Sequence, residues 1–275
     1  MQDIMAKLAE GGVALLGCGK MGGAMLDGWI EAGLPPASVT VFDTHPSPRV
    51  QELAAQGLTL NPEAAPSPAV CILSVKPQFM TEALAQVAPM AASGTLFVSV
   101  AAGLTLDYFA AQLGAEAKVI RTMPNTPAAV GKGVTAIYAP AGVGEAGAEI
   151  AEALLSAVGQ TVRLESEDQI DAVTGVSGSG PAYVFHMIEA LAAAGEAEGL
   201  APELAMTLAR ATVIGAGALA AGSDESAAQL RINVTSPGGT TQAGLAQLMD
   251  PESGLPPLMK RTVAAAAGRS RELAG

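Results

Sequence analysis

The chain has 275 residues, a formal net charge of −12, 50% hydrophobic residues and only 3% aromatic ones. Its length suffices for two domains with separate cores, and its acidity argues against nucleic acid and anionic membranes, which need a basic surface. The only two cysteines, Cys18 and Cys71, form no disulfide framework, which fits a reducing cytoplasm. We therefore expect a cytoplasmic protein with a small-molecule partner.

Two further features bear on location. Residues 1–4 lack the basic start and apolar core of a secretion signal. The stretch 83–106 carries no charge and is long enough to span a membrane, but Gln86, Pro89 and the turn at 93–95 divide it into helix, turn and strand. We expect no membrane span.

The first predicted unit is a strand, a glycine turn and a helix. The apolar run 13–16 is typical of a buried parallel strand, and the spacing of apolar residues predicts a helix over 20–32. The first turn of this helix offers free N–H groups and a dipole that favours an anion. The motif at the junction consists of Gly17, Cys18, Gly19, Lys20, Met21 and Gly22.

This pattern indicates dinucleotide binding. Gly17 would allow the tight turn, Gly19 the close approach of a pyrophosphate, and Gly22 the packing of helix on strand. A second apolar run at 39–42 ends in Asp43, close to the position about 20 residues further on where an acidic residue is expected. The alternative is an ordinary glycine-rich helix start. Cys18 is either a small loop residue or a reactive thiol at a helix N-terminus.

Strands and helices then alternate along the chain. Strands are predicted at 58–60, 69–75, 96–100, 119–121, 134–138 and 161–164, with helices at 50–56, 80–87, 106–113 and 145–158. This alternation predicts an α/β fold with a doubly wound parallel sheet, whose ligands lie at the carboxyl ends of the strands. The further cofactor-binding candidates at those ends are Val75, Lys76, Pro77, Ala101, Gly103 and Asn125.

Beyond residue 164 the pattern predicts helices only. They cover 168–175, 181–198, 202–221, 226–234, 240–249 and 256–273. The change predicts a dinucleotide-binding domain at 1–164 and an all-α domain at 165–275. His45 and His186, the only histidines, lie far apart and in no ligand cluster, so no metal site is expected.

Two more glycine-rich strings precede helices in the second domain, at 175–181 and at 235–241. The second would present free N–H groups and hydroxyls at a helix start, which suits a carboxylate. Helix capping with tight packing is the alternative.

Six strings together resemble the pyrroline-5-carboxylate reductase family. The resemblance covers nearly the whole chain, and the last two strings are the most specific, because a nucleotide-binding domain alone would not predict them. The strings are GCGKMGGAM at 17–25, SVKPQ at 74–78, VSVAAGLTL at 98–106, IRTMPNTPAAVGKG at 120–133, TGVSGSGPAYVF at 174–185 and SPGGTT at 236–241.

The resemblance implies hydride transfer from NADP(H) or NAD(H) to the C=N carbon of Δ1-pyrroline-5-carboxylate, which yields L-proline in the last step of proline biosynthesis. It also implies an N-terminal Rossmann domain and a C-terminal helical domain that interlocks two subunits, often in larger rings of dimers. In such enzymes the substrate lies where the nucleotide domain of one subunit meets the helical domain of its partner.

The family motif also implies roles for single residues. Ser236, Gly238, Gly239 and Thr240 would hold the substrate carboxylate. Thr241 matches the position thought to hydrogen-bond the ring nitrogen, and we assign it orientation and proton relay because a hydroxyl is too weak an acid to act alone.

Lys76 and Asn125 are placed on the cofactor side. The alternatives are a solvated lysine and a turn-forming asparagine.

The sequence departs from the family pattern in two places. Ser226 and Ala227 stand where many members carry His-Pro, which puts a substrate-side histidine in doubt. Asp43 favours the ribose diol of NAD, whereas the family usually prefers NADPH. Thr44, Ser47 and Arg49 could still form a pocket for the 2′-phosphate of NADPH if Asp43 turns away.

Two rival functions differ in class. The first is a related imine or β-hydroxyacid dehydrogenase. A lysine that acts as general acid in the helical domain would favour it, but no lysine occurs between residues 164 and 259. A nucleotide-sensing or scaffolding oligomer would need no substrate pocket, and the intact SPGGTT string speaks against it.

Overall fold

The computed structural model describes residues 2–274, which fall into two compact units. Unit 1 contains the residues up to Gly178 together with those from Ala266 onward, and unit 2 contains Ser179–Ala265. Each unit is described by itself.

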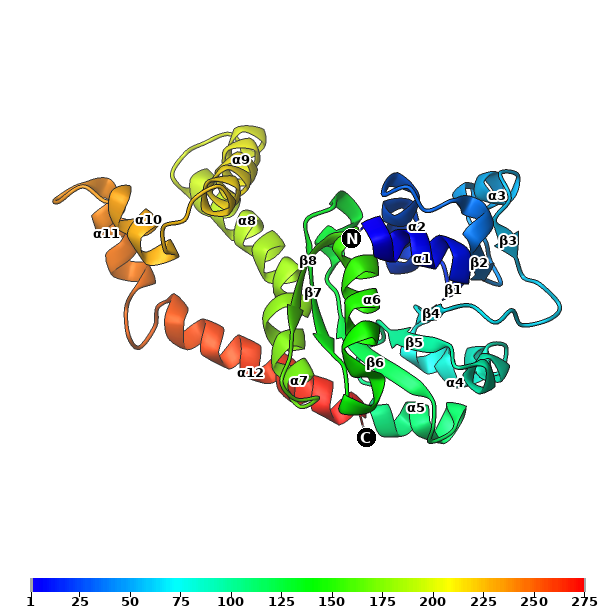
Figure 1. The fold of residues 1–275 in the computed structure, drawn as a ribbon. Helices are drawn as coiled ribbons and strands as arrows, with labels where there is room; N and C mark the ends of the chain where they lie inside the picture. The colour runs from blue at the N-terminus through cyan, green and yellow to red at the C-terminus, as the bar shows by residue number, and fades with distance from the viewer. Residues whose placement is uncertain (1, 275) are drawn as a thin grey trace. The chain divides into compact units, whose positions relative to one another are not determined.

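Unit 1 is built on an eight-stranded sheet with helices on both faces (Figure 1). The strand order is β3-β2-β1-β4-β5-β6-β7-β8, so the direction of winding reverses at β1. The predicted doubly wound α/β fold is confirmed. The strands are β1 (Val13–Leu16), β2 (Val39–Phe42), β3 (Thr59–Leu60), β4 (Val70–Leu73), β5 (Leu96–Ser99), β6 (Lys118–Met123), β7 (Gly133–Tyr138) and β8 (Gly159–Arg163).

One strand pair departs from the predicted parallel sheet. β7 runs antiparallel to β6, and β8 then pairs with β7 in parallel. The connection at 124–132 holds only a short 3-10 turn, η4 (Thr126–Val130), and is shorter than the crossover of about a dozen residues that a parallel pair needs. The chain therefore turns back beside β6.

Alternating side chains of the strands build the two faces. Val13 and Leu15 of β1 belong to one buried cluster, and Ala14 and Leu16 to the other. The first face is covered by α1 (Gln2–Gly11), α2 (Lys20–Glu31), α3 (Pro48–Ala54) and α6 (Gly144–Ser156). The second is covered by α4 (Met80–Leu84), η3 (Ala88–Ser93) and α5 (Leu106–Leu113), and the short turn η2 (Pro77–Phe79) precedes α4.

The N-terminal helix α1 is not among the predicted elements. Its apolar stripe is short, but Leu8 is buried in the first cluster and Ile4 and Met5 pack against it. Tertiary packing thus stabilises a helix whose sequence signal is weak.

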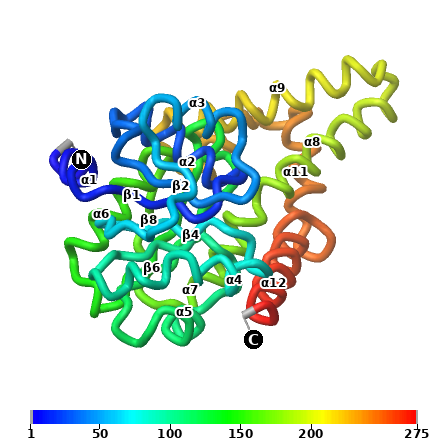
Figure 2. Tube along the Cα trace, turned by 90° about the vertical axis from the view of Figure 1, so that its right-hand side faces the viewer, coloured from blue at the N-terminus to red at the C-terminus, as the bar shows by residue number. Residues whose placement is uncertain are grey.

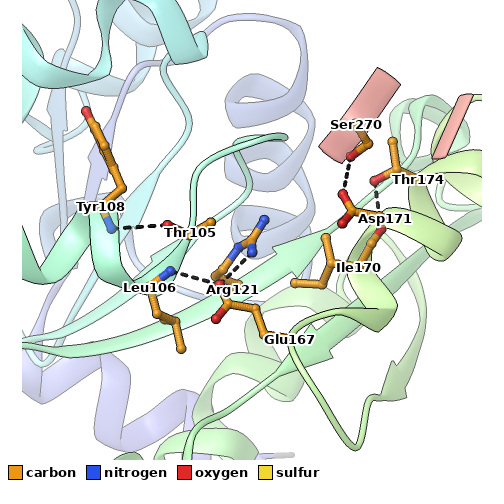
Figure 3. Close-up of polar contacts among 9 residues, drawn as sticks. All are labelled: Thr105, Leu106, Tyr108, Arg121, Glu167, Ile170, Asp171, Thr174 and Ser270. Carbon is orange, nitrogen blue, oxygen red and sulfur yellow. Dashed lines mark hydrogen bonds and ion pairs between the residues drawn. The ribbon is translucent and has the colours of Figure 1, made fainter. Parts of the chain in front are cut away.

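Unit 1 extends past the last strand because a buried ion pair ties the next segment to the sheet (Figure 3). Arg121 of β6, only 5% exposed, donates to Glu167 at 2.6 Å, and the same oxygen accepts from the N–H of Leu106 at 2.8 Å, where α5 begins. The helix α7 (Gln169–Val173) and a π-helical turn (Thr174–Gly178) follow Glu167 directly.

The end of the chain also belongs to unit 1. Ser270, in the last turns of α12 (Leu255–Ala274), donates to the carboxylate of Asp171 at 2.6 Å (Figure 3). The compact units therefore divide at Gly178 and not at 164, the predicted boundary after the last strand. Side-chain contacts, which a change in periodicity does not reveal, cause the difference.

Unit 2 is all helical, as predicted. The helices α8 and α9 lie side by side as a hairpin (Figure 2), and the buried residues between them are alanines, Ala192, Ala205 and Ala209. Large apolar side chains point outward instead, including Phe185 and Ile214, which are 59% and 63% exposed. The helices are α8 (Gly180–Ala197), α9 (Pro202–Ala221), α10 (Ala227–Asn233), α11 (Thr240–Leu248) and the start of α12.

Among the described residues, α9 is long and apolar enough to cross a membrane by length and composition, and only 11% of its most apolar window is buried in the chain. Core helices of soluble proteins pass the same test of length and composition.

Candidate functional site

The glycine motif joins β1 to α2. Gly17 has a φ of +85°, and a Cβ there would lie 2.8 Å from Val75 and 3.0 Å from the backbone of Ser74. A Cβ at Gly22 would clash with the carbonyl oxygen of Gly17, whereas one at Gly19 would meet nothing within 4 Å. Gly17 and Gly22 are thus required by the backbone, and the surface at Gly19 is open.

A cavity of about 490 Å³ opens beside this loop. Its walls come from the carboxyl ends of β1, β2 and β4, where the strand order reverses and where α/β sheets bind ligands. The polar or glycine residues in its wall include Gly17, Gly19, Asp43, Thr44, His45 and Lys76. Val75 also lies in the wall, and Pro77 begins the η2 turn next to it.

A second cavity, also of about 490 Å³, is lined by other residues of the same loop. Lys20 and Cys18 line it together with His45, Ser47 and Arg49 of the β2–α3 connection. Arg49 is already paired with Asp27 at 2.9 Å. Met21, in contrast, packs against the core of unit 1.

The hydroxyl of Ser74 indicates that the loop can accept a ligand. Ser74 Oγ is the one buried side-chain polar atom of the described residues that has no hydrogen-bond partner. It lies behind the loop, 3.2 Å from where a Cβ of Gly22 would be. An unpaired buried hydroxyl costs about 1–3 kcal/mol, which a ligand or its bound water would offset. Residue type alone does not distinguish this serine.

Free N–H groups at the start of α2 complete the match to a dinucleotide. Gly19 is the N-cap of α2 and no side chain caps the helix there. The open backbone at Gly19, the uncapped helix and the unpaired hydroxyl together fit a pyrophosphate-bearing cofactor.

Asp43 faces the glycine loop. One carboxylate oxygen accepts from the N–H of Cys18 at 2.6 Å, and the other from the N–H of His45 at 2.7 Å. Burial and the charge of Asp43 raise the pKa of the Cys18 thiol to about 12. The thiol therefore stays protonated, which favours the small loop residue over the reactive thiol.

Asn125 is 9% exposed and bridges two segments of unit 1. Its side-chain oxygen accepts from the N–H of Val134 at 2.9 Å, and its nitrogen donates to the carbonyl of Ser177 at 3.2 Å. These bonds give Asn125 a structural role at the end of β6, and its contact with the nicotinamide stays a prediction.

The loop after β5 carries Ala101 and Gly103. The N–H of Ala101 donates to Ser99 Oγ at 3.2 Å. Gly103 has a φ of +74°, and a Cβ there would lie 3.2 Å from Leu273 of α12. The end of the chain thus packs against a predicted cofactor loop, which sequence order does not suggest.

The predicted carboxylate site lies in unit 2, at the start of α11. Gly239 is the N-cap without a side-chain cap, and Thr240 and Thr241 are exposed in the first turn. The N–H of Gly239 donates to the carbonyl of Ser236 at 3.0 Å, and that of Gly238 to the side chain of Gln242 at 2.6 Å.

Two of the expected donors, the N–H groups of Gly238 and Gly239, are therefore already engaged. The first-turn N–H groups of α11 and the exposed hydroxyls of Ser236, Thr240 and Thr241 remain as candidate donors of hydrogen bonds to a bound anion. Gln242, which shapes this loop, is missed by the sequence reasoning. Its position four residues after Gly238 is the signal that would have found it.

In the described part of the chain, no group of three or more His, Cys, Asp or Glu side chains is placed to hold a metal ion.

Comparisons with known proteins agree with this arrangement. A family described as pyrroline-5-carboxylate reductase dimerisation matches residues 167–273, and one described as NADP oxidoreductase, coenzyme F420-dependent, matches 12–103. A pyrroline-5-carboxylate reductase from Pseudomonas aeruginosa is 40% identical over 265 residues, which cover 95% of this chain and 96% of the relative.

Solved structures are similar over almost the whole chain. A pyrroline-5-carboxylate reductase from Coxiella burnetii has a TM-score of 0.89 and 32% identity, and the match covers 96% of this chain and 99% of that one. The Plasmodium falciparum enzyme with NADP bound has a TM-score of 0.80 and 27% identity, with 96% and 98% covered.

Proposed function

This chain belongs to the pyrroline-5-carboxylate reductase family, and on that premise we propose a division of labour between its two units. The protein is an oxidoreductase that reduces Δ1-pyrroline-5-carboxylate to L-proline with a pyridine nucleotide. Its helical segment is a dimerisation domain. The proposal concerns which residues do this, with which cofactor, and in which assembly.

Unit 1 holds the cofactor. The N–H groups of Gly19 and Lys20 at the start of α2 hold the pyrophosphate, with Ser74 Oγ behind the loop. The loops that carry Lys76, Ala101 and Asn125 position the nicotinamide half. When bound, the reduced nicotinamide supplies the hydride.

Unit 2 holds the substrate. The exposed hydroxyls of Ser236 and Thr240 and the first-turn N–H groups of α11 bind the substrate carboxylate. Thr241 donates a hydrogen bond to the ring nitrogen and so orients the C=N bond. The cyclic imine can arrive already protonated, so Thr241 relays a proton without acting as the only acid. The uncapped start of α11 inside the family motif is the observation that carries this assignment.

The preferred cofactor is NADPH, with NADH as the weaker substrate. The carboxylate oxygens of Asp43 accept from the main-chain N–H groups of Cys18 and His45, which offsets part of the negative charge that would oppose a 2′-phosphate. Thr44, His45 and Ser47 offer polar groups on the side where that phosphate would lie.

The functional assembly is a homodimer built through unit 2, with larger rings of dimers, in the cytoplasm. The outward apolar side chains of α8 and α9 need a cover, and a second copy of the same helices supplies it. Burial of α9 against the second copy would also explain why this helix is apolar although it does not cross a membrane. A net charge of −12 makes nucleic acid an unsuitable partner.

The test mixes purified protein with Δ1-pyrroline-5-carboxylate and follows the absorbance of NADPH and, separately, of NADH. We expect proline to form, faster with NADPH. Thr241→Ala should lower kcat by about 10–100-fold without abolishing it, and Thr241→Ser should restore most of the rate. If both cofactors bind but neither is oxidised, the assignment of substrate is wrong. If Thr241→Ala is fully active, Thr241 is not the catalytic residue.

A further inference from the structure

The structure assigns Asp43 a positioning role that its place after β2 does not suggest. We propose that Asp43 and Asn61 clamp the glycine loop for NADH and NADPH alike, and that Thr44 and His45 decide between the two cofactors. This inference rests on the proposed function only in that a pyridine nucleotide binds at the glycine loop.

The carboxylate of Asp43 joins two loops. Cys18, whose N–H it accepts at 2.6 Å, lies inside the glycine motif, and His45, whose N–H it accepts at 2.7 Å, lies in the β2–α3 connection. Hydrogen bonds from N–H groups to a carboxylate are roughly twice as strong as neutral ones. One oxygen is committed to each loop, so the side chain ties the end of β1 to the end of β2.

Asn61 fixes the main chain of the same residue. Its side-chain oxygen accepts from the N–H of Asp43 at 2.9 Å, and its nitrogen donates to the carbonyl of Asp43 at 2.8 Å. Asn61 is also the one described residue other than glycine with a positive φ, 46°. Asparagine adopts this conformation more readily than most L residues, and the two amide bonds to Asp43 hold it there.

Asp43 is thus held by four hydrogen bonds, two at its main chain and two at its carboxylate. A carboxylate that reads the ribose diol must direct its oxygens at the two ribose hydroxyls. Here each of those oxygens already accepts one backbone N–H, and these two bonds fix the direction of the carboxylate, although each oxygen can accept a further bond. Asp43 holds the glycine loop in place. NADH and NADPH need this loop equally, because both carry the same pyrophosphate.

Discrimination then falls to side chains beside Asp43 in the cavity wall. Thr44 Oγ1 and His45 Nδ1 lie 2.9 Å apart, and both residues are exposed in the wall. Arg49 is the obvious cation for a 2′-phosphate, but it is paired with Asp27 at 2.9 Å and with Glu52 at 3.5 Å. Thr44 and His45 line the same cavity as Asp43, whereas Arg49 lines the second cavity, so the Thr44–His45 pair is the part of this connection that shares the wall with Asp43.

The first experiment measures binding of NADH and of NADPH by fluorescence titration, without substrate. Asp43→Asn and Asn61→Gly should each weaken both cofactors by about tenfold or more, with the NADH-to-NADPH ratio within about threefold of the parent protein. Glycine accepts the positive φ, so Asn61→Gly removes only the amide bonds and keeps the charge of Asp43.

Glu82→Gln is the matched control. Glu82 lines the same cavity and its loss removes one negative charge, as Asp43→Asn does. It should leave both affinities near those of the parent protein. If Asp43→Asn instead weakens NADH alone while NADPH binds as well or better, Asp43 reads the ribose and the proposal is overturned.

The second experiment needs no cofactor. Hydrogen–deuterium exchange over residues 17–23 should be faster in both Asp43→Asn and Asn61→Gly than in the parent protein, and the Cys18 thiol should react faster with a thiol reagent. Unchanged exchange in both variants overturns the clamp. This readout does not depend on reductase activity, so failure of the proposed substrate and failure of the clamp are separate outcomes.

The third experiment tests the other half of the proposal. Thr44→Ala and His45→Ala keep the N–H of His45, so exchange over 17–23 should stay as in the parent protein. The affinity ratio of NADPH to NADH should fall by about threefold or more in at least one of them. If neither variant changes the ratio, the Thr44–His45 pair does not discriminate.

Discussion

The two units bury their apolar side chains in opposite ways. In unit 1 the largest fully buried residues include Trp29, Phe97 and Phe109, and helices close both faces of the sheet. In unit 2 the buried core consists of Ala192, Ala205 and Ala209, while the large apolar side chains of α8 and α9 are exposed. One chain is therefore enough to complete unit 1 and is not enough to complete unit 2.

The two units therefore differ in the source of their stability. Burial of apolar surface contributes roughly 25 cal/mol per Å², and alanines have little surface to bury. Unit 1 draws its stability from its own core, whereas unit 2 depends on a second surface, in line with its identity as a dimerisation domain.

The largest expected effect comes from charging the exposed face of unit 2. Ile214→Asp should weaken dimer association by about 100-fold or more, since the new carboxylate would be buried at the interface without a partner. Sedimentation equilibrium measures it. Val162→Asp, at a 46% exposed apolar residue of β8 in unit 1, should leave the dimer intact. Equal dissociation in both variants would mean that α9 is not at the interface.

A second change acts inside unit 1. Arg121→Met should lower the free energy of unfolding by about 3–5 kcal/mol, because Glu167 loses its buried partner. Urea unfolding measures it, and the double variant with Glu167→Gln should recover part of the loss. Arg163→Gln breaks two exposed ion pairs, with Glu145 and with Glu152, and should cost about 1 kcal/mol or less. Equal losses would show that burial is not what makes the Arg121 pair important.

A third change separates neighbouring glycines of α2. Gly22→Ala places a methyl group against the carbonyl of Gly17 and should cost about 1–3 kcal/mol and most of the cofactor affinity. Gly23→Ala meets only the carbonyl of Cys18, at 3.9 Å, and should be neutral or slightly stabilising. Thermal unfolding and NADPH titration compare them. A tolerated Gly22→Ala would refute the close packing of α2 on the glycine loop.

The last prediction is a pH dependence in unit 1, which is absent at neutral pH and develops only above pH 9.0. The pKa of Cys18 is raised from 9.0 to about 12 by burial and by Asp43, so the unfolded thiol ionises first. The stabilisation that this thiol provides is complete below pH 9.0 and is lost as the pH rises toward about 12. Cys18→Ala should flatten that decline in unfolding experiments at several pH values. An unchanged slope would mean that other groups, such as buried Cys71, account for it.

Most of unit 1 is predictable from sequence because its signals are local. The run 13–16, the glycine motif and the run 39–42 each lie within a few residues, and the structure confirms their strands and helix at nearly the predicted bounds. The reversal of β7 and the helix α1 were not predicted, since the first depends on loop geometry and the second on packing.

The candidate site divides in the same way. The glycine roles follow from a motif whose spacing is set by one turn of backbone, and the helix start at 240 follows from its own string. The bonds of Asp43 to Cys18 and of Asn125 to Ser177 join side chains to main chain at separations that no pattern encodes.

Periodicity, glycine spacing and motif strings are properties of short segments, and they are enough to predict the doubly wound sheet, the helical second half, the family and the reaction. Packing of distant segments was needed to show that Asp43 faces the glycine loop, that Arg121 and Glu167 extend unit 1 past its last strand, and that Ser270 contacts it again. These contacts join residues far apart in the chain, so their geometry exists only once the strands and helices are packed.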